Sequence, residues 1–234
     1  MLFRSGSLGV HDGSCFEYDH SVVPGKGQWT TFPSIPDGGR SGGGLIYDST
    51  MDALVYSAGS QRLKRGSTGA IDFQTTWAYS LKNPAAGWVR KADIPFHGNH
   101  MNFVTARDDK GKEHHFFFGG QSGDEEETGN TDEMYEYNAV SDVWMAKQSI
   151  PNPLGHAAAS ARAIGCGFIV AGGRLNDGLT DAIMYYDIPT NRWTKIGQLT
   201  HKIHTNVCVV SKEMLRCETG WATGTFSWTR GITV

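Results

Sequence analysis

The sequence predicts an all-β fold made of many short strands. Glycine is abundant, with 30 residues in a chain of 234, while aromatic residues make up 11% and charged residues only 19%. This composition suits short strands joined by tight turns better than helices packed in a bundle. A chain of this length is able to bury one sizeable core, and we expect residues 1–234 to form a single domain.

A recurring tryptophan is the main signal. Four tryptophans are separated by 59, 56 and 49 residues: Trp29, Trp88, Trp144 and Trp193. Six residues after each of them, an apolar residue is followed by a small turn residue: Ile35-Pro36, Ile94-Pro95, Ile150-Pro151 and Leu199-Thr200. An internal period of this length is typical of propellers and solenoids.

Two further landmarks keep the same phase as the tryptophans. An aromatic strand precedes each tryptophan and contains the residues Phe16 and Tyr18, Trp77 and Tyr79, Tyr135 and Tyr137, and Tyr185 and Tyr186. Before that strand, three repeats hold a hydrophobic run that ends in small residues, at 54–59, 116–120 and 168–173. Strand-like runs between glycines favour a β-propeller with four-stranded antiparallel blades.

This order of landmarks resembles the Kelch repeat of the galactose oxidase-like superfamily. The resemblance covers roughly residues 14–220 and is most specific at Gly119-Gly120…Tyr137…Trp144 and at Gly172-Gly173…Tyr186…Trp193. The first full repeat departs from the pattern, with Ala58-Gly59 for the double glycine and a longer gap between tyrosine and tryptophan. The last repeat reads Glu218-Thr219-Gly220. Kelch membership implies that the blades surround a central channel.

Each landmark has a structural role. A glycine pair that ends a buried strand lets the backbone take positive φ and turn where a Cβ atom would clash. The tyrosine and the tryptophan supply large flat surfaces between neighbouring blades, so that both faces of a sheet are buried. We therefore assign these periodic residues to the core and not to a ligand site.

The landmarks divide the chain into blades. Residues 37–95, 96–151 and 152–200 are three complete blades, 1–36 carry the later half of a blade, and 201–234 carry an earlier half and a tail. The two halves would combine to close a four-bladed ring without open sheet edges. Alternatively, the tail adds a strand to the last blade, which gives four to five blades in a fragment of a six- or seven-bladed propeller. We favour the second arrangement.

The loops that lead into the innermost strands are expected to form the binding face. Four or five residues after the Ile-Pro landmark, these loops place four residues at nearly equivalent positions: Arg40, His100, His156 and His204. We expect them to bind a ligand at the channel mouth. Three imidazoles are able to hold a transition metal, but hydrogen bonding of each histidine to a neighbouring blade is the simpler interpretation. We assign no metal site.

Two further loops on this face carry opposite charges in adjacent blades. The loop after Gly59 holds the basic residues Arg62, Lys64 and Arg65. The loop after Gly120 holds the acidic residues Asp124, Glu125, Glu126 and Glu127, without the alternating spacing of a calcium loop. The simple interpretation is a pair of solvated patches, and the functional one is a docking surface for a charged partner.

The cysteines suggest one pairing. In a hairpin centred on Lys212 and Glu213, Cys208 falls opposite Cys217. A disulfide would form between them in an oxidising compartment, whereas two buried thiols are the alternative. The four cysteines show no Cys-x-x-Cys spacing, which argues against a zinc ribbon or a thioredoxin-like pair.

Charge and motifs restrict the function. The formal net charge of −3 disfavours nucleic acid and anionic membranes as partners, and no apolar run is long enough to span a bilayer. The sequence holds no nucleophile elbow, Walker loop, dinucleotide fingerprint or zinc-protease motif. We therefore expect a soluble scaffold, without a cofactor, that binds another protein or a carbohydrate through its loops.

The Kelch resemblance keeps an enzyme open as the alternative. Kelch-type blades also occur in galactose oxidase-like copper enzymes, sialic-acid epimerases and plant specifier proteins, so the fold does not exclude catalysis. A copper radical oxidase needs a tyrosine cross-linked to a cysteine, and Cys15 near Tyr18 is a thin match to that requirement. The compartment also stays open. A complete chain without a signal would be cytoplasmic, and a fragment of a secreted propeller would be extracellular.

Overall fold

The computed structural model describes residues 13–19, 27–62, 70–123, 129–157, 160–204, 207–211, 214–218 and 232–233. Over these residues the chain forms strands β1 to β21 and one short 3-10 turn, η1 (Pro84–Ala86), and it contains no α-helix. The predicted all-β class is confirmed. Within the same residues, no helix has the length and apolar character needed to cross a membrane.

Three consecutive sheets have four antiparallel strands each. The first consists of β3 (Gly44–Asp48), β4 (Ala53–Ser57), β7 (Thr76–Ser80) and β8 (Trp88–Lys91). The second consists of β9 (Asn102–Arg107), β10 (Glu113–Phe118), β11 (Met134–Asn138) and β12 (Val143–Ala146). The third consists of β13 (Arg162–Ile164), β14 (Gly167–Ala171), β17 (Ala182–Asp187) and β18 (Arg192–Gln198). Each sheet lies within one of the three repeats 37–95, 96–151 and 152–200.

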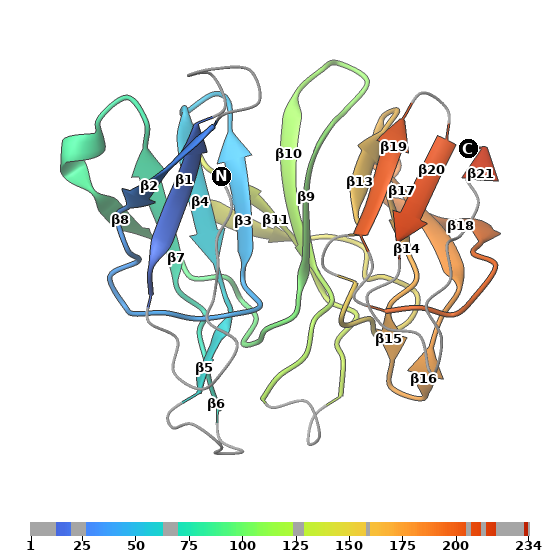
Figure 1. Cartoon of the computed structure of the whole chain (residues 1–234). Coiled ribbons are helices and arrows are strands. Elements are labelled where there is room, and N and C mark those ends of the chain that lie inside the picture. The colour runs from blue at the N-terminus through green and yellow to red at the C-terminus, as the bar shows by residue number, and fades with distance from the viewer. Residues whose placement is uncertain are drawn as a thin grey trace.

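Small hairpins are inserted before the third strand of the first and third sheets. They are β5 (Ser60–Arg62) with β6 (Ala70–Asp72), and β15 (Arg174–Leu175) with β16 (Gly178–Leu179). Both hairpins extend from the lower end of the molecule in Figure 1, whereas the turn between β9 and β10 lies at the upper end. The two ends of the sheets are therefore distinct surfaces.

Shorter sheets stand at the two ends of the series. Strand β1 (Cys15–Asp19) pairs with β2 (Gln28–Phe32), and neither is hydrogen-bonded to any other strand of the described residues. At the other end, β19 (Val207–Ser211), β20 (Met214–Glu218) and β21 (Ile232–Thr233) form a three-stranded sheet. The tail of the chain thus supplies the third strand of this sheet, as in the second of the two predicted arrangements.

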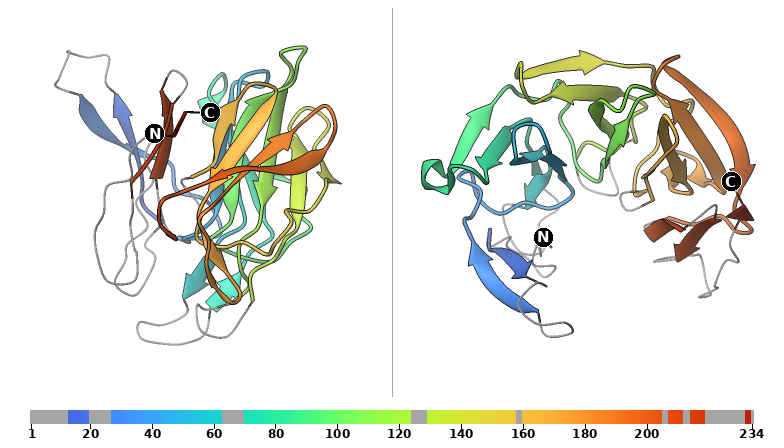
Figure 2. Two further views of the ribbon diagram at one scale, coloured as in Figure 1. Left: turned by 90° about the vertical axis from the view of Figure 1, so that its right-hand side faces the viewer. Right: turned by 90° about the horizontal axis from the view of Figure 1, so that it is seen from above.

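The sheets follow one another along an arc in chain order. Figure 2, in the view from above, shows the arc running from β1 and β2 at one end to β19, β20 and β21 at the other. The first strands of successive sheets lie side by side on its inner side, with β3 against β9, β9 against β13, and β13 against β19. Among the described strands, no hydrogen-bonded ladder joins the two ends of the arc.

The hydrophobic core lies between neighbouring sheets. Between the second and third sheets, the rings of Phe116 and Phe168 have centroids 5.2 Å apart, and Tyr186 and Trp193 pack against Phe168 at 5.1 and 5.4 Å. These side chains belong to one buried cluster, and a second cluster fills the space between the first two sheets. The periodic aromatic residues of the three full sheets are therefore core residues, as we predicted, whereas Phe16, Tyr18 and Trp29 of the first hairpin are exposed.

Trp88, Trp144 and Trp193 each also donate a hydrogen bond to the preceding repeat. The indole nitrogen donates to a carbonyl at 2.8 Å from Trp88 to Pro33, at 2.9 Å from Trp144 to Ala92, and at 3.0 Å from Trp193 to Gln148. Ala92 and Gln148, which accept two of these bonds, also donate their own backbone N–H groups to the repeat that follows. Ala92 N donates to Asp142 Oδ1 and Gln148 N to Asn191 Oδ1. Two of the three junctions are thus fixed by a pair of bonds.

The double glycine makes a close backbone approach possible. Gly119 has φ +61°, and a Cβ atom there would lie 2.2 Å from the carbonyl oxygen of Leu154. Gly111, in the turn between β9 and β10, also has a positive φ of +78°, but a Cβ atom there would have no neighbour within 4 Å. The two glycines separate the effect of positive φ from the effect of crowding.

We predict that Gly119→Ala destabilises the protein far more than Gly111→Ala. The left-handed backbone should cost each variant about 1 to 2 kcal/mol, and the clash with Leu154 should add at least about 2 kcal/mol to the first. Urea unfolding followed by tryptophan fluorescence measures both values. Equal losses in the two variants would contradict the role of close packing at Gly119.

Candidate functional site

Three of the four residues predicted at the channel mouth come together. The imidazole of His100 stacks on that of His156, with ring centroids 4.3 Å apart and an interplanar angle of 25°. The ring of His204 meets His156 edge to face, with centroids 5.8 Å apart and an angle of 84°. We refer to His100, His156 and His204 as the histidine cluster. Successive sheets contribute its members, so the cluster depends on the way the sheets are stacked.

A repeated backbone bridge places two of these histidines. Asn99 and Gln121 exchange two backbone hydrogen bonds of 2.8 and 2.9 Å immediately before His100, and Gly155 and Arg174 do the same before His156. After each bridge the histidine takes positive φ, 50° for His100 and 52° for His156. The bridge ties the loop leading into the first strand to the loop that leaves the second. Both histidines are consequently held at the end of the sheets that carries the small hairpins.

Arg40 lies outside the histidine cluster. Its side chain is buried and donates a hydrogen bond of 3.0 Å to the carbonyl oxygen of Ala58. It also forms an ion pair with Asp37 and covers the ring of Phe73, with 4.2 Å between the guanidinium carbon and the ring centroid. The structure thus gives this arginine a packing role within its own repeat.

Arg40 was predicted to lie with the histidines because we counted residues from the Ile-Pro landmark, and this count does not give the equivalent position in the first sheet. In the first sheet the backbone bridge joins Ser41 to Ser60, so the next residue, Gly42, stands where the other sheets have histidine. Its φ of +71° agrees with the positive φ of His100 and His156. A Cβ atom on this glycine would lie 2.6 Å from the backbone nitrogen of His100. The glycine therefore lets the first sheet approach the histidine cluster closely.

A buried amide lies at the centre of the histidine cluster. The ring nitrogen Nε2 of His156 is 2.8 Å from Oε1 of Gln121, and both side chains are buried. The other amide atom, Gln121 Nε2, is buried and has no hydrogen-bond partner in the described structure. An unpaired buried donor typically costs about 1 to 3 kcal/mol. A ligand that brings an acceptor to this atom would recover that energy.

Burial keeps the central histidine, His156, uncharged. Desolvation lowers the pKa of His156 to about 3, and the nearby His100, His204 and Arg174 lower it further by repulsion between positive charges. His156 is therefore neutral at physiological pH. Among the described residues, the three histidines are not a set whose ligand nitrogens all lie within 4.8 Å of one another. The cluster is thus arranged for hydrogen bonding more than for metal coordination.

The charged loops of the predicted docking surface fall mainly outside the described residues. These are Lys64 and Arg65 of the basic loop and Asp124, Glu125, Glu126 and Glu127 of the acidic loop. The backbone of Arg62 ends strand β5. The bases of the two loops are joined, because Asp72 accepts hydrogen bonds from Gly123 N at 2.5 Å and from Asn99 Nδ2 at 2.8 Å. The loops therefore leave the molecule side by side.

The two cysteines of the last hairpin face each other. Cys208 and Cys217 are directly opposed in the ladder between β19 and β20, as the predicted register required. Their sulfur atoms are 2.09 Å apart and form a disulfide in the structure. Both residues are buried against Ile169 and Ile203 in one hydrophobic cluster, so the pair also belongs to the core between the last two sheets.

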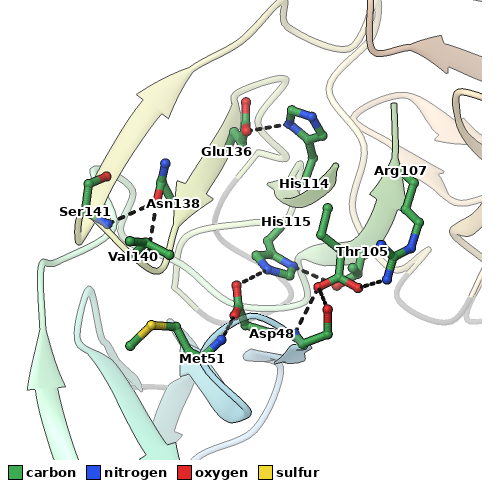
Figure 3. Close-up of polar contacts among 12 residues, drawn as sticks. Asp48, Met51, Thr105, Arg107, His114, His115, Glu136, Asn138, Val140 and Ser141 are labelled. Atoms are coloured by element: carbon green, nitrogen blue, oxygen red, sulfur yellow. Dashed lines mark hydrogen bonds and ion pairs between the residues drawn. The ribbon is translucent and has the colours of Figure 1, made fainter. Parts of the chain in front are cut away.

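A second polar cluster, which the sequence analysis missed, lies at the opposite end of the sheets. His115 Nε2 is 2.8 Å from Asp48 Oδ2, and His115 Nδ1 is 2.9 Å from Thr105 Oγ1 (Figure 3). Glu113 accepts hydrogen bonds from the backbone nitrogen and the hydroxyl of Ser49 at 2.9 and 2.8 Å. These contacts join the turn between β3 and β4 to the strands of the next sheet.

An adjacent buried pair lies on the other face of the same strand. His114 Nδ1 is 2.7 Å from Glu136 Oε1, and Lys147 Nζ is 2.8 Å from Glu136 Oε2. Burial acts to raise the pKa of Glu136, but the hydrogen bonds from His114 and Lys147 outweigh it and lower the pKa to about 2. The bond to Glu136 is also the main cause that raises the pKa of His114. This arrangement is a charged and fully paired group.

A signal for this second cluster is present in the sequence. Counted back from the small residues that end each second strand, His115 occupies the position of Leu54 in the first sheet and Phe168 in the third. Asp48 likewise occupies the position of Ala106 and Ile164. Polar side chains at core positions are costly unless they are hydrogen-bonded. Comparing equivalent positions between repeats would therefore have identified both residues.

Comparison with known proteins supports the fold alone. No protein-family model matches the chain, and no curated protein matches it in sequence. Among 163 matching chains of solved structures is YjhT, with a TM-score of 0.72 and 14% sequence identity. The aligned part covers 91% of this chain and 67% of YjhT. At this identity the likeness establishes a shared fold alone.

We predict that acid destabilises the protein through His156. Its pKa is about 3 in the folded state against 6.5 as the ordinary value, so the unfolded chain binds the extra proton between these limits. Stability therefore falls as the pH drops below 6.5, by about 1.4 kcal/mol per pH unit. In His156→Gln the contribution of this residue to the slope should vanish. From pH 7 to pH 5 the free energy of unfolding of the variant should therefore rise by about 2 kcal/mol relative to that of the native protein.

Urea unfolding at pH 7 and pH 5 measures this change. His201→Gln, which replaces an exposed histidine, corrects for the loss of a titratable residue as such. If the native protein and His156→Gln lost stability in parallel on acidification, burial of a neutral imidazole at this position would be disproved.

Proposed function

We propose that the chain is part of a Kelch-type β-propeller that acts as a binding scaffold, with its ligand at the histidine cluster. The order of the Kelch landmarks supports this family, as do three four-stranded sheets placed along an arc. The fold likeness to YjhT over 91% of the chain points in the same direction. In this proposal the arc is a segment of a ring, and the histidine cluster faces its axis.

The observation that carries the binding proposal is the unpaired amide of Gln121 beside the stacked histidines. Ligand sites typically combine a few convergent polar groups with a rigid support. Gln121 is held rigidly, since its backbone forms the bridge to Asn99 and its Oε1 bonds to His156. Its Nε2 has no hydrogen-bond partner among the described residues.

The ligand proposed for this site is rich in hydrogen-bond acceptors. The imidazole of His156 is uncharged and pairs with an amide, so the site suits hydroxyl and carbonyl groups better than an isolated cation. Both a carbohydrate and the polar side chains of a protein partner offer such groups. The hairpins β5–β6 and β15–β16 project from the same end of the sheets and would flank the bound partner (Figure 1).

A copper oxidase is the less favoured alternative. It requires a cysteine joined to a tyrosine beside the metal ligands. Cys15 is instead buried in a cluster with Phe32 and Trp88, and the ring of Tyr18 packs on Trp29 with centroids 4.9 Å apart. The residues that this chemistry needs are therefore used for packing between β1, β2 and the first full sheet.

We expect binding to depend on the histidine cluster. Native protein would be screened against an array of neutral and acidic glycans and against a displayed peptide library, and each hit would be remeasured by calorimetry. His100→Ala and Gln121→Ala should weaken a genuine ligand by about tenfold or more, because each removes a contact at the centre of the site.

Lys110→Ala is the matched control for this experiment. Lys110 is exposed on the turn between β9 and β10, at the opposite end of the sheets, so its removal should leave affinity unchanged. A ligand that bound both cluster variants as tightly as the native protein would refute the proposed site. Glycan hits and peptide hits would identify the class of partner.

A further inference from the structure

The second polar cluster borders a cavity at the end of the sheets opposite the histidine cluster. The cavity has a volume of about 330 Å³ and lies among the turn after β3, the β9–β10 hairpin and the turn after β11. Its lining includes Asp48, Arg107, Glu113, His115 and Asn138. None of these residues takes part in the binding function proposed above, so the role of this site is a separate question.

Three metal-ligating side chains converge beside this cavity. One ligand atom from each of Asp48, Glu113 and His115 lies within 4.8 Å of the other two. Asp48 and His115 are buried, at 5% and 2% exposure, and Glu113 is partly buried. Asp48 Oδ2 and His115 Nε2 are 2.8 Å apart and are hydrogen-bonded to each other in the absence of an ion.

Each of these side chains is held in place from behind. Thr105 Oγ1 contacts Nδ1 of His115 at 2.9 Å, the backbone nitrogen of Met51 donates to the second oxygen of Asp48 at 2.6 Å, and Ser49 holds Glu113 (Figure 3). In a typical metal-ligating histidine, one ring nitrogen binds the ion, and the other is hydrogen-bonded to a neighbouring group that fixes the orientation of the ring. The three ligands are thus preorganised by groups that would not themselves touch the ion.

The charges of the site also suit a cation. The two carboxylates are opposed by Arg107, which forms an ion pair with Glu113. Glu113 also accepts two hydrogen bonds from Ser49. Lys112 and Glu136, which also line the cavity, carry opposite charges. The lining therefore keeps one excess negative charge.

We propose that Asp48, Glu113 and His115 form a site for a first-row divalent cation of the Mn²⁺ or Zn²⁺ type. One imidazole and two carboxylates are the donors that such ions accept, whereas Mg²⁺ and Ca²⁺ prefer oxygen donors alone. On binding, the neutral ring of His115 carries its proton on Nδ1, where it is donated to Thr105, and Nε2 becomes a ligand. The cavity provides room for water at the remaining positions.

Metal binding at this site has a structural consequence. Asp48 belongs to the first full sheet, and Glu113 and His115 belong to the second, so the ion links two sheets. An ion that binds the folded chain and not the unfolded chain raises stability with its concentration. Chelator-treated protein should accordingly show a higher melting temperature after addition of Zn²⁺ or Mn²⁺, with saturation at one ion per chain by calorimetry.

Neighbouring histidines supply a matched pair of variants. His115→Gln removes a proposed ligand and should weaken Zn²⁺ by at least about tenfold. His114→Gln removes an equally buried histidine that is bonded to Glu136 on the opposite face of the strand, and it should keep the native affinity. If the two variants bound Zn²⁺ equally well, the assignment of His115 would be overturned.

A second measurement needs no variant. Mn²⁺ broadens nuclear magnetic resonances of nearby atoms, so titration of the native protein should broaden the amide signals of Ser49, Glu113 and His115 first. Broadening centred on the histidine cluster would place the metal at the other end of the sheets and overturn the proposal. Absence of saturable binding at millimolar Mn²⁺ and Zn²⁺ would do the same.

Discussion

The rest of the architecture depends on one recurring contact. It is the hydrogen bond that the indole N–H of Trp88, Trp144 or Trp193 donates to the preceding sheet. A sheet with two apolar faces must be covered on both, but apolar contact has no direction and would allow many stackings. The indole N–H reaches a carbonyl at the same place in each preceding repeat, at Pro33, Ala92 and Gln148. Since three successive junctions repeat the same bond, the sheets from β1–β2 to the third full sheet take similar positions relative to their neighbours, and an arc results.

A regular stack of sheets presents two different ends. At one end, the backbone bridges hold histidines at positive φ, and the cluster of His100, His156 and His204 draws on successive repeats. At the other end, buried carboxylates meet His115 across a single junction. The histidine cluster results from the backbone bridges that the repeats share. The second polar cluster results from polar residues, Asp48 and His115, at positions where other repeats have apolar ones. A repeat protein is thereby able to carry separate chemistry on its two ends without altering its core.

The sequence predicted those features that recur and missed those that do not. The tryptophan and glycine landmarks located the three full sheets. The count from the Ile-Pro landmark brought the histidines together, and the hairpin centre at Lys212 and Glu213 placed the cysteines opposite each other. The position of Arg40 was misjudged because loop length varies between repeats, whereas the backbone bridge that sets the true equivalence is visible only in three dimensions. Asp48 and His115 are 67 residues apart on different sheets, so their contact is a product of stacking. Only their polar character at core positions is evident beforehand.

The junction at Pro33 differs in chemistry from the two that follow it. Ala92 and Gln148 are each held at N–H and C=O, but proline has no N–H to donate, and Ala86, at the position of the acceptor residues Asp142 and Asn191, has no side-chain oxygen. In an array where each unit touches only its neighbours, stability is approximately a sum of unit and interface terms. The hairpin of β1 and β2 therefore rests on the interface with the smaller number of bonds. Of the three junctions that carry a tryptophan bond, the one that holds this hairpin should therefore open first.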